Sequence, residues 1–148
     1  MNRRRTVVIS ITEPGRKAKL PKGWHDMLRL AFQDYDPQRL HPENAVLFTP
    51  TMAARLARFA RKHRGANILV HCAAGISRSG AVVEALLEAL PEYEDRGWMR
   101  RPNTHVKVLL KRALGLVPLG YDEAHNGAHD SRIKSTTDEL WPPRPISD

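Results

Sequence analysis

The only cysteine of the 148-residue chain, Cys72, lies in the stretch HCAAGISRSG, which combines several reactive side chains. His71 precedes it, Arg78 follows six positions later, and Ser79 comes directly after the arginine. A thiolate is a strong nucleophile, an arginine guanidinium can hold two phosphate oxygens at once, and a hydroxyl can donate to the sulfur. These residue types in this order predict nucleophilic attack on a phosphate ester.

The elements around this stretch predict how it is held. NILVHC (residues 67–72) is an apolar run typical of a buried strand, and SRSGAVVEALLEAL (residues 77–90) is typical of a helix. The tight turn between them needs Gly75, because glycine adopts backbone angles that other residues resist. We expect the N–H groups of the turn to converge beside the positive end of the helix, in a site for a dianionic phosphate that also favours ionised Cys72. The residues that line this site are Ala73, Ala74, Gly75, Ile76, Ser77 and Arg78.

A plainer interpretation makes Cys72 a small buried apolar side chain at the end of a strand. A cysteine and an arginine six positions apart form a weak pattern in a chain with 24 lysine and arginine residues. The full set is more specific, because it also includes the histidine, the glycine at the third position, the serine, the upstream strand and the downstream helix. We therefore favour the catalytic interpretation.

The rest of the chain predicts an α/β fold. Apolar patterns indicate strands in residues 6–12 and 27–34, and helices in residues 49–65 and 105–115. Thr49 is the expected N-cap of the first of these helices, and Lys107 and Lys111 are expected on the outer face of the last. The order strand, helix, strand, tight turn, helix is that of right-handed crossover units. We therefore expect a central, mostly parallel sheet with helices on both faces and ligands at the carboxyl ends of its strands.

Length and composition fit one soluble domain, with 41% hydrophobic and 27% charged residues. Periodicity is lost after Gly120, so we assign residues 1–119 to the catalytic domain and residues 120–148 to an irregular C-terminal tail that Trp141 could pin to it. No run approaches the roughly 18 apolar residues of a membrane span, and the apolar run after MNRRR is too short for a signal peptide. A single cysteine agrees with a reducing compartment, and we expect a cytoplasmic protein.

The formal charge of +8 is concentrated in the first 119 residues, because the tail holds six acidic and only three basic residues. A basic body attracts anions such as phosphorylated proteins or nucleic acid. A solvated basic surface with no partner is an equally open interpretation of the charge alone.

The stretch HCAAGISRS (residues 71–79) resembles the H-C-x5-R-[ST] signature of the protein tyrosine phosphatase superfamily, and its G-x-S-R-S ending is most similar to the dual-specificity branch. The likeness extends over residues 6–115. It implies a phosphocysteine intermediate, no metal or cofactor, and a catalytic aspartate on a separate upstream loop. It also implies that His71 orients the loop and tunes the thiolate, and that Ser79 assists the later departure of the sulfur.

Asp34 and Asp36 are the candidates for that aspartate, which would protonate the departing oxygen and then activate water. Asp34 comes at the end of a predicted strand, at the sheet edge where the cysteine loop is expected, whereas Asp26 precedes the same strand. The surrounding FQDYDP also resembles the acid-bearing turn of several compact family members. We favour Asp34 and keep Asp36 as the alternative; both could instead only cap the turn before Pro37.

The variable loop positions, Ala73, Ala74, Ile76 and Ser77, indicate the substrate class. Phosphoinositide phosphatases of the superfamily tend to carry lysines there, and relatives that act on RNA 5′-phosphates usually have an asparagine where Ser77 stands. The resemblance therefore implies a phosphorylated protein, with phosphotyrosine as the expected substrate and phosphoserine and phosphothreonine as additions.

Two other classes of function stay open: a rhodanese-like sulfurtransferase, which also uses a cysteine in a short anion loop, and a basic nucleic-acid-binding module with an incidental cysteine. Nucleic acid is the less favoured partner. No metal site is expected, because the six remaining histidines lack a trustworthy ligand spacing: His25, His41, His63, His105, His125 and His129.

Overall fold

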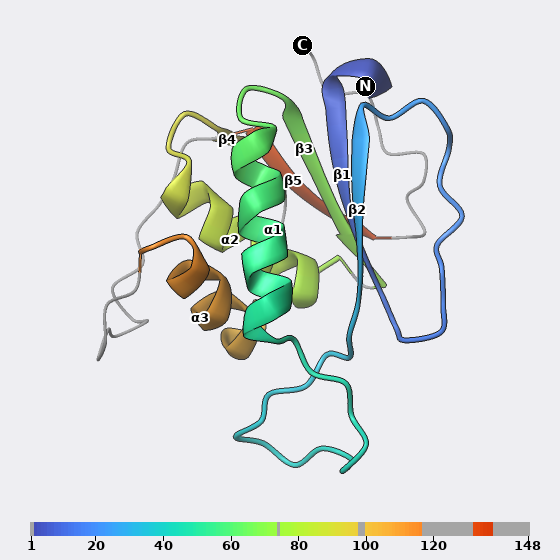
Figure 1. The fold of residues 1–148 in the computed structure, drawn as a ribbon, viewed down its shortest axis with the longest axis vertical. Coiled ribbons are helices and arrows are strands. Elements are labelled where there is room, and N and C mark those ends of the chain that lie inside the picture. The colour runs from blue at the N-terminus through green and yellow to red at the C-terminus, as the bar shows by residue number, and fades with distance from the viewer. Residues whose placement is uncertain (1, 74, 98–99, 117–131, 138–148) are drawn as a thin grey trace.

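The computed structural model describes residues 2–73, 75–97, 100–116 and 132–137, the last of these as backbone only. Its centre is a five-stranded sheet in the order β2-β1-β3-β5-β4, in which all neighbouring strands are parallel (Figure 1). The predicted α/β class is confirmed. The strands are β1 (Thr6–Thr12), β2 (Asp26–Ala31), β3 (Asn67–Cys72), β4 (Glu94–Asp95) and β5 (Arg132–Thr137).

Three α-helices accompany the sheet: α1 (Pro50–Lys62), α2 (Arg78–Ala89) and α3 (Thr104–Ala113), with a short 3₁₀ turn at Arg3–Arg5 before β1. As predicted, Thr49 caps α1, because its hydroxyl accepts a hydrogen bond from the backbone N–H of Met52 at 3.1 Å. α3 packs against both α1 and α2, so the three helices form one layer on the same side of the sheet (Figure 1). Helices on both faces were expected; the described residues contain helices on one face only.

The core lies between this helical layer and one face of the sheet. Alternate residues of β1 and β3, among them Val7, Ile9 and Val70, join the buried side chains of the helices in one cluster that also includes Cys72. The intervening Val8 and Leu69 are buried too, on the opposite face. Both faces of the two central strands are therefore covered, which explains their continuous apolar runs.

The segment expected to be an irregular tail contains a strand. β5 lies between β3 and β4 and runs parallel to both, with Thr137 in register with Cys72. The sequence RIKSTT holds one large apolar residue, so hydrophobic periodicity gave no signal for it. Residues 117–131 and 138–148, including Trp141, lie outside the described residues.

The prediction that Lys107 and Lys111 lie on the outer face of α3 is also wrong. Lys107 and Lys111 are buried, because this face of α3 packs against α2. Their ammonium groups pair with carboxylates from α2, Lys107 with Glu84 at 3.0 Å and Lys111 with Glu88 at 2.8 Å. The two helices are thus joined by two ion pairs in which the lysines are buried and the glutamates partly exposed, and such pairs are costly to break from one side only.

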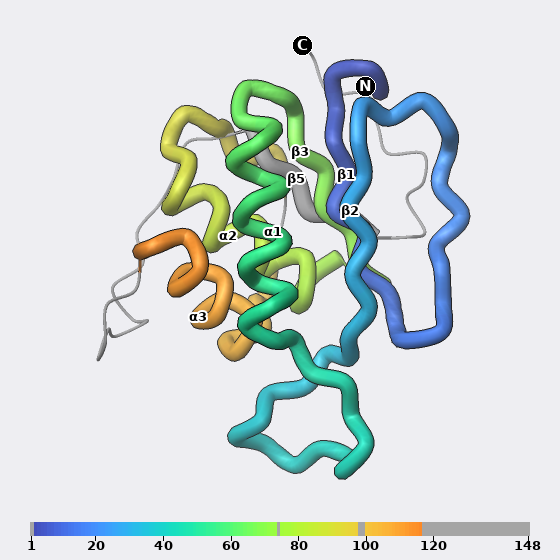
Figure 2. Tube along the Cα trace, viewed as in Figure 1, coloured from blue at the N-terminus to red at the C-terminus, as the bar shows by residue number. Residues whose placement is uncertain are grey.

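Asp26 opens β2 at the amino end of the sheet, as the sequence predicted. The backbone N–H of Met27 donates to its carboxylate at 2.8 Å, and His63 contacts it at 2.8 Å. These two hydrogen bonds lower the pKa of Asp26. The residues that follow β2, by contrast, belong to the opposite end, where a long connection to α1 (residues 32–49) extends beyond the helices (Figure 2).

Candidate active site

The sulfur of Cys72 lies at the carboxyl end of β3, inside the turn that leads to α2. Cys72 is buried, and Gly75 takes the positive φ of 69° that the sequence led us to expect at this turn. The backbone N–H groups of Gly75 and Ser79 donate to the sulfur at 3.2 and 3.4 Å, and the hydroxyl of Ser79 lies 3.2 Å from it. Two backbone N–H donors therefore point at the sulfur from within the turn. Ala74 lies outside the described residues.

The amino end of α2 adjoins this turn. Ser77 is the N-cap residue of α2, but its side chain makes no capping hydrogen bond. Its hydroxyl donates to Asp34 at 2.8 Å. The first turn of α2 carries no acidic residue. The positive end of the helix dipole is therefore not neutralised by the chain's own carboxylates within that turn, a condition that favours a bound anion.

Arg78 is buried, with 4% of its surface exposed, and is held from one side. Its Nη1 donates to the carbonyl oxygen of Phe32 at 2.8 Å and lies 3.1 Å from the carboxylate of Glu13. Its Nε is buried as well but has no hydrogen-bond partner among the described residues. A buried N–H of a charged group without an acceptor is unfavourable, so this edge of the guanidinium is suited to a ligand oxygen.

His71 lies on the opposite face of β3 from Cys72 and is fully buried. Its Nε2 is 2.6 Å from the hydroxyl of Ser10, the residue beside it in the register of β1 and β3. The hydrogen bond fixes the imidazole against the neighbouring strand.

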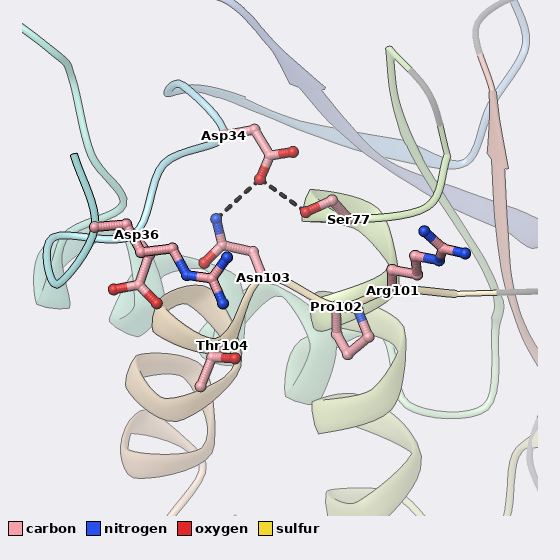
Figure 3. A pocket seen from close by; sticks show the side chains of 8 residues that line it. Asp34, Asp36, Ser77, Arg101, Pro102, Asn103 and Thr104 are labelled. Carbon is pink, nitrogen blue, oxygen red and sulfur yellow. Dashed lines mark hydrogen bonds between the residues drawn. The ribbon is translucent and has the colours of Figure 1, made fainter. Parts of the chain in front are cut away.

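Asp34 lies at the loop, and Asp36 lies further along the same turn. Oδ1 of Asp34 accepts hydrogen bonds from Ser77 and from the side-chain amide of Asn103, at 2.8 and 2.9 Å (Figure 3). Asp36 instead accepts from the backbone N–H of Gln38 at 2.9 Å and caps its own turn. Of the two candidates, only Asp34 makes a hydrogen bond with the cysteine loop among the described residues.

A surface pocket of about 480 Å³ adjoins the loop at Ser77. Aspartates and arginines from separate segments share its wall, and Arg101 extends along one side of it in Figure 3. Its lining comprises Asp34, Asp36, Arg39, Ser77, Arg101, Pro102, Asn103 and Thr104. The pocket brings together the acid candidate, one loop residue and two cations, so it could receive the group that carries a phosphate.

Sequence reasoning did not identify three residues of the site: Ser10, Glu13 and Asn103. Ser10 and Glu13 lie at or just beyond the carboxyl end of β1. The rule that ligands bind at the carboxyl ends of parallel strands, which pointed to Asp34, could therefore have identified them as well. Asn103 had a local signal as well, because an asparagine before the helical run of residues 104–113 is a typical N-cap. Its contact with Asp34 depends on how α3 packs and has no sequence signal.

No family model matches this sequence, and no curated protein or solved structure matches it either. The resemblance to the phosphatase signature therefore depends on the motif and on the geometry described above. Among the described residues, no group of three histidine, cysteine or acidic side chains is arranged to hold a metal ion. No helix in the same part of the chain has the length and apolar character needed to cross a bilayer.

Proposed function

We propose that this protein is a cysteine-dependent phosphomonoester hydrolase of the protein tyrosine phosphatase type. The observation that carries the proposal is the pairing of two features in one loop: donors that converge on the sulfur of Cys72, and a buried Arg78 whose Nε lacks an acceptor. A phosphoryl group between these two residues would be attacked by the sulfur of Cys72 and would accept two charge-assisted hydrogen bonds from Arg78.

In the first step, the thiolate of Cys72 attacks phosphorus. The S–P bond forms as the ester P–O bond breaks, and Asp34 gives its proton to the departing oxygen, which leaves as an alcohol or phenol. The amides of the loop and the edge of Arg78 hold the phosphoryl oxygens, whose charge they stabilise in the transition state. His71 keeps the start of the loop in place through Ser10.

In the second step, water hydrolyses the phosphocysteine. The carboxylate of Asp34 takes a proton from the water, whose oxygen attacks phosphorus as the S–P bond breaks. Inorganic phosphate leaves and the thiolate of Cys72 is regenerated. The hydroxyl of Ser79, 3.2 Å from the sulfur, stabilises the departing thiolate with a hydrogen bond.

A phosphorylated protein is the proposed substrate, with phosphotyrosine first and phosphoserine and phosphothreonine as additions. The described variable loop positions, Ala73, Ile76 and Ser77, are uncharged, so the loop offers no side chain for a second phosphate on an inositol ring. The adjoining pocket is lined by Arg39 and Arg101, which suit acidic residues next to the phosphorylated one. A cytoplasmic location would keep the single thiol reduced.

Hydrolysis of 4-nitrophenyl phosphate by the wild type and by Cys72→Ser tests the proposal. We expect turnover by the wild type and a loss of about a thousandfold or more in the variant, because a serine hydroxyl is a much weaker nucleophile here. A phosphopeptide panel would then rank phosphotyrosine against phosphoserine and phosphothreonine.

Turnover that survives the substitution would remove the proposal. Transfer of sulfur from thiosulfate to cyanide without phosphatase activity would point to a sulfurtransferase. Salt-dependent binding of nucleic acid without either activity would favour the basic binding module.

A further inference from the structure

Asn103 connects three parts of the site through one side chain. Its Nδ2 donates to Oδ1 of Asp34 at 2.9 Å and to the backbone carbonyl of Tyr35 at 3.1 Å. Its Oδ1 accepts from the backbone N–H of Val106 at 3.2 Å, which caps α3. The residue is 9% exposed, so water competes little for these hydrogen bonds.

The backbone around Asn103 is fixed to the cysteine loop as well. Its N–H donates to the carbonyl of Ser77 at 3.1 Å, and the N–H of Arg101 donates to the carbonyl of Ile76 at 3.1 Å. The acid turn, the cysteine loop and the start of α3 are therefore attached to one another at Asn103, and Figure 3 shows Asp34 bonded to both Asn103 and Ser77.

The partners of Asn103 also determine which way its amide faces. The N–H of Val106 can only donate, so it must meet the amide oxygen, and the carbonyl of Tyr35 can only accept, so it must meet the amide nitrogen. The nitrogen is thereby directed to Asp34. A neutral donor at this place orients the carboxyl without adding a charge to the pocket.

We propose that Asn103 is a positioning residue for the general acid, an inference that rests on the proposed phosphatase function. Ser77 and Asn103 both donate to Oδ1 of Asp34, while Oδ2 has no hydrogen bond to any described residue. The proton of the acid is therefore carried by Oδ2, and the two donors fix the direction in which Oδ2 presents it to the departing oxygen. Asn103 acts through Asp34 and does not touch the substrate.

Asn103→Ser separates this role from the capping of α3. Serine is a good N-cap, so α3 keeps its first hydrogen bond, but serine has no amide to reach Asp34. The need for a proton depends on the leaving group, so the variant is compared on two esters. With phenyl phosphate we expect kcat/KM, which reports only the steps up to departure of the phenol, to fall about tenfold, because one hydrogen bond to a carboxyl is lost. With 2,4-dinitrophenyl phosphate, whose phenolate leaves without a proton, we expect kcat/KM to change by about twofold or less.

Thr49→Ala is the matched control, because it removes the N-cap of α1 and has no hydrogen bond to the acid. We expect a lower Tm for this variant and the same ratio of rates on the two esters as in the wild type. Asn103→Ala, which loses both the cap and the donor, should combine the lower Tm with the altered ratio.

The outcomes distinguish the inference from the function it rests on. If Cys72→Ser retains turnover, the proposed function fails and the inference fails with it. If Cys72→Ser is inactive but Asn103→Ser loses the same factor on both esters, or loses nothing on phenyl phosphate, the function stands and the positioning role is refuted.

Discussion

Replacing Arg78 with lysine keeps the positive charge of the site but removes its planar fork. In the structure, Nη1 of Arg78 already contacts the Phe32 carbonyl and the Glu13 carboxylate, so the Nε edge of the guanidinium is left for a ligand. A lysine ammonium is a single compact charge, so it cannot bond the oxygens of Phe32 and Glu13 and the phosphate at the same time. Two charge-assisted hydrogen bonds to phosphate contribute about 1.5–3 kcal/mol each. We therefore expect a loss of about 3 kcal/mol or more, which is a hundredfold or larger fall in kcat/KM.

The assay is hydrolysis of 4-nitrophenyl phosphate at neutral pH, together with inhibition by inorganic phosphate, which should weaken in parallel. Glu13→Gln is the control, because glutamine still accepts from Nη1 while the charge, which is partly exposed, is removed. Its rate should stay within about threefold of the wild type. An Arg78→Lys variant that keeps more than about a third of wild-type kcat/KM would show that the free Nε edge does not hold phosphate.

The remaining predictions concern stability and the rim of the pocket. Lys111→Met should lower the free energy of unfolding in urea by about 3 kcal/mol, because it removes the cation that pairs with the largely buried Glu88, and adding Glu88→Leu should restore most of this loss. Equal stability of the wild type and the single variant would mean that the ion pair does not stabilise the fold. The lowered pKa of Asp26 stabilises the fold above the unfolded value, near pH 4, and this contribution is lost as the pH falls through the folded value. Asp26→Asn should therefore be less stable than the wild type at pH 7, and the difference should be modest because Asp26 is 39% exposed. A difference in urea midpoint that does not shrink below pH 4 would contradict the assignment of this stability to the ionised carboxylate and its hydrogen bonds from Met27 and His63. Arg101→Ala should raise KM for an acidic phosphopeptide up to about fivefold and leave 4-nitrophenyl phosphate unaffected, and equal effects on both substrates would argue against a role in recognising acidic flanking residues.

Much of the fold could be predicted from local patterns. The strand Thr6–Thr12 has the predicted bounds, and the helix capped by Thr49 begins where expected. Both elements have strong signals within one segment: a β-branched run in the first, and an N-cap, a proline and an apolar stripe in the second. The placement of Asp34 beside the cysteine loop followed from a topological rule, since the carboxyl ends of parallel strands share one edge.

The errors share a physical origin, because each depends on a neighbour distant in sequence. Lys107 and Lys111 lie four positions apart, as surface lysines of a helix often do, and only the matching spacing of Glu84 and Glu88 on α2 makes their burial tolerable. β5 is recruited through backbone pairing with β3 and β4, which its composition does not reveal. The amide of Asn103 reaches Asp34 across 69 positions of the chain.

The position of β5 has a consequence for synthesis on the ribosome. The strand that bears the nucleophile pairs with β1 on one side and β5 on the other, and of the strands in the described residues β5 is translated last. Until that segment emerges, the nascent polypeptide presents an unpaired edge at β3, which is a template for pairing with foreign chains. Chaperone engagement during elongation should therefore persist until residues 132–137 have left the exit tunnel.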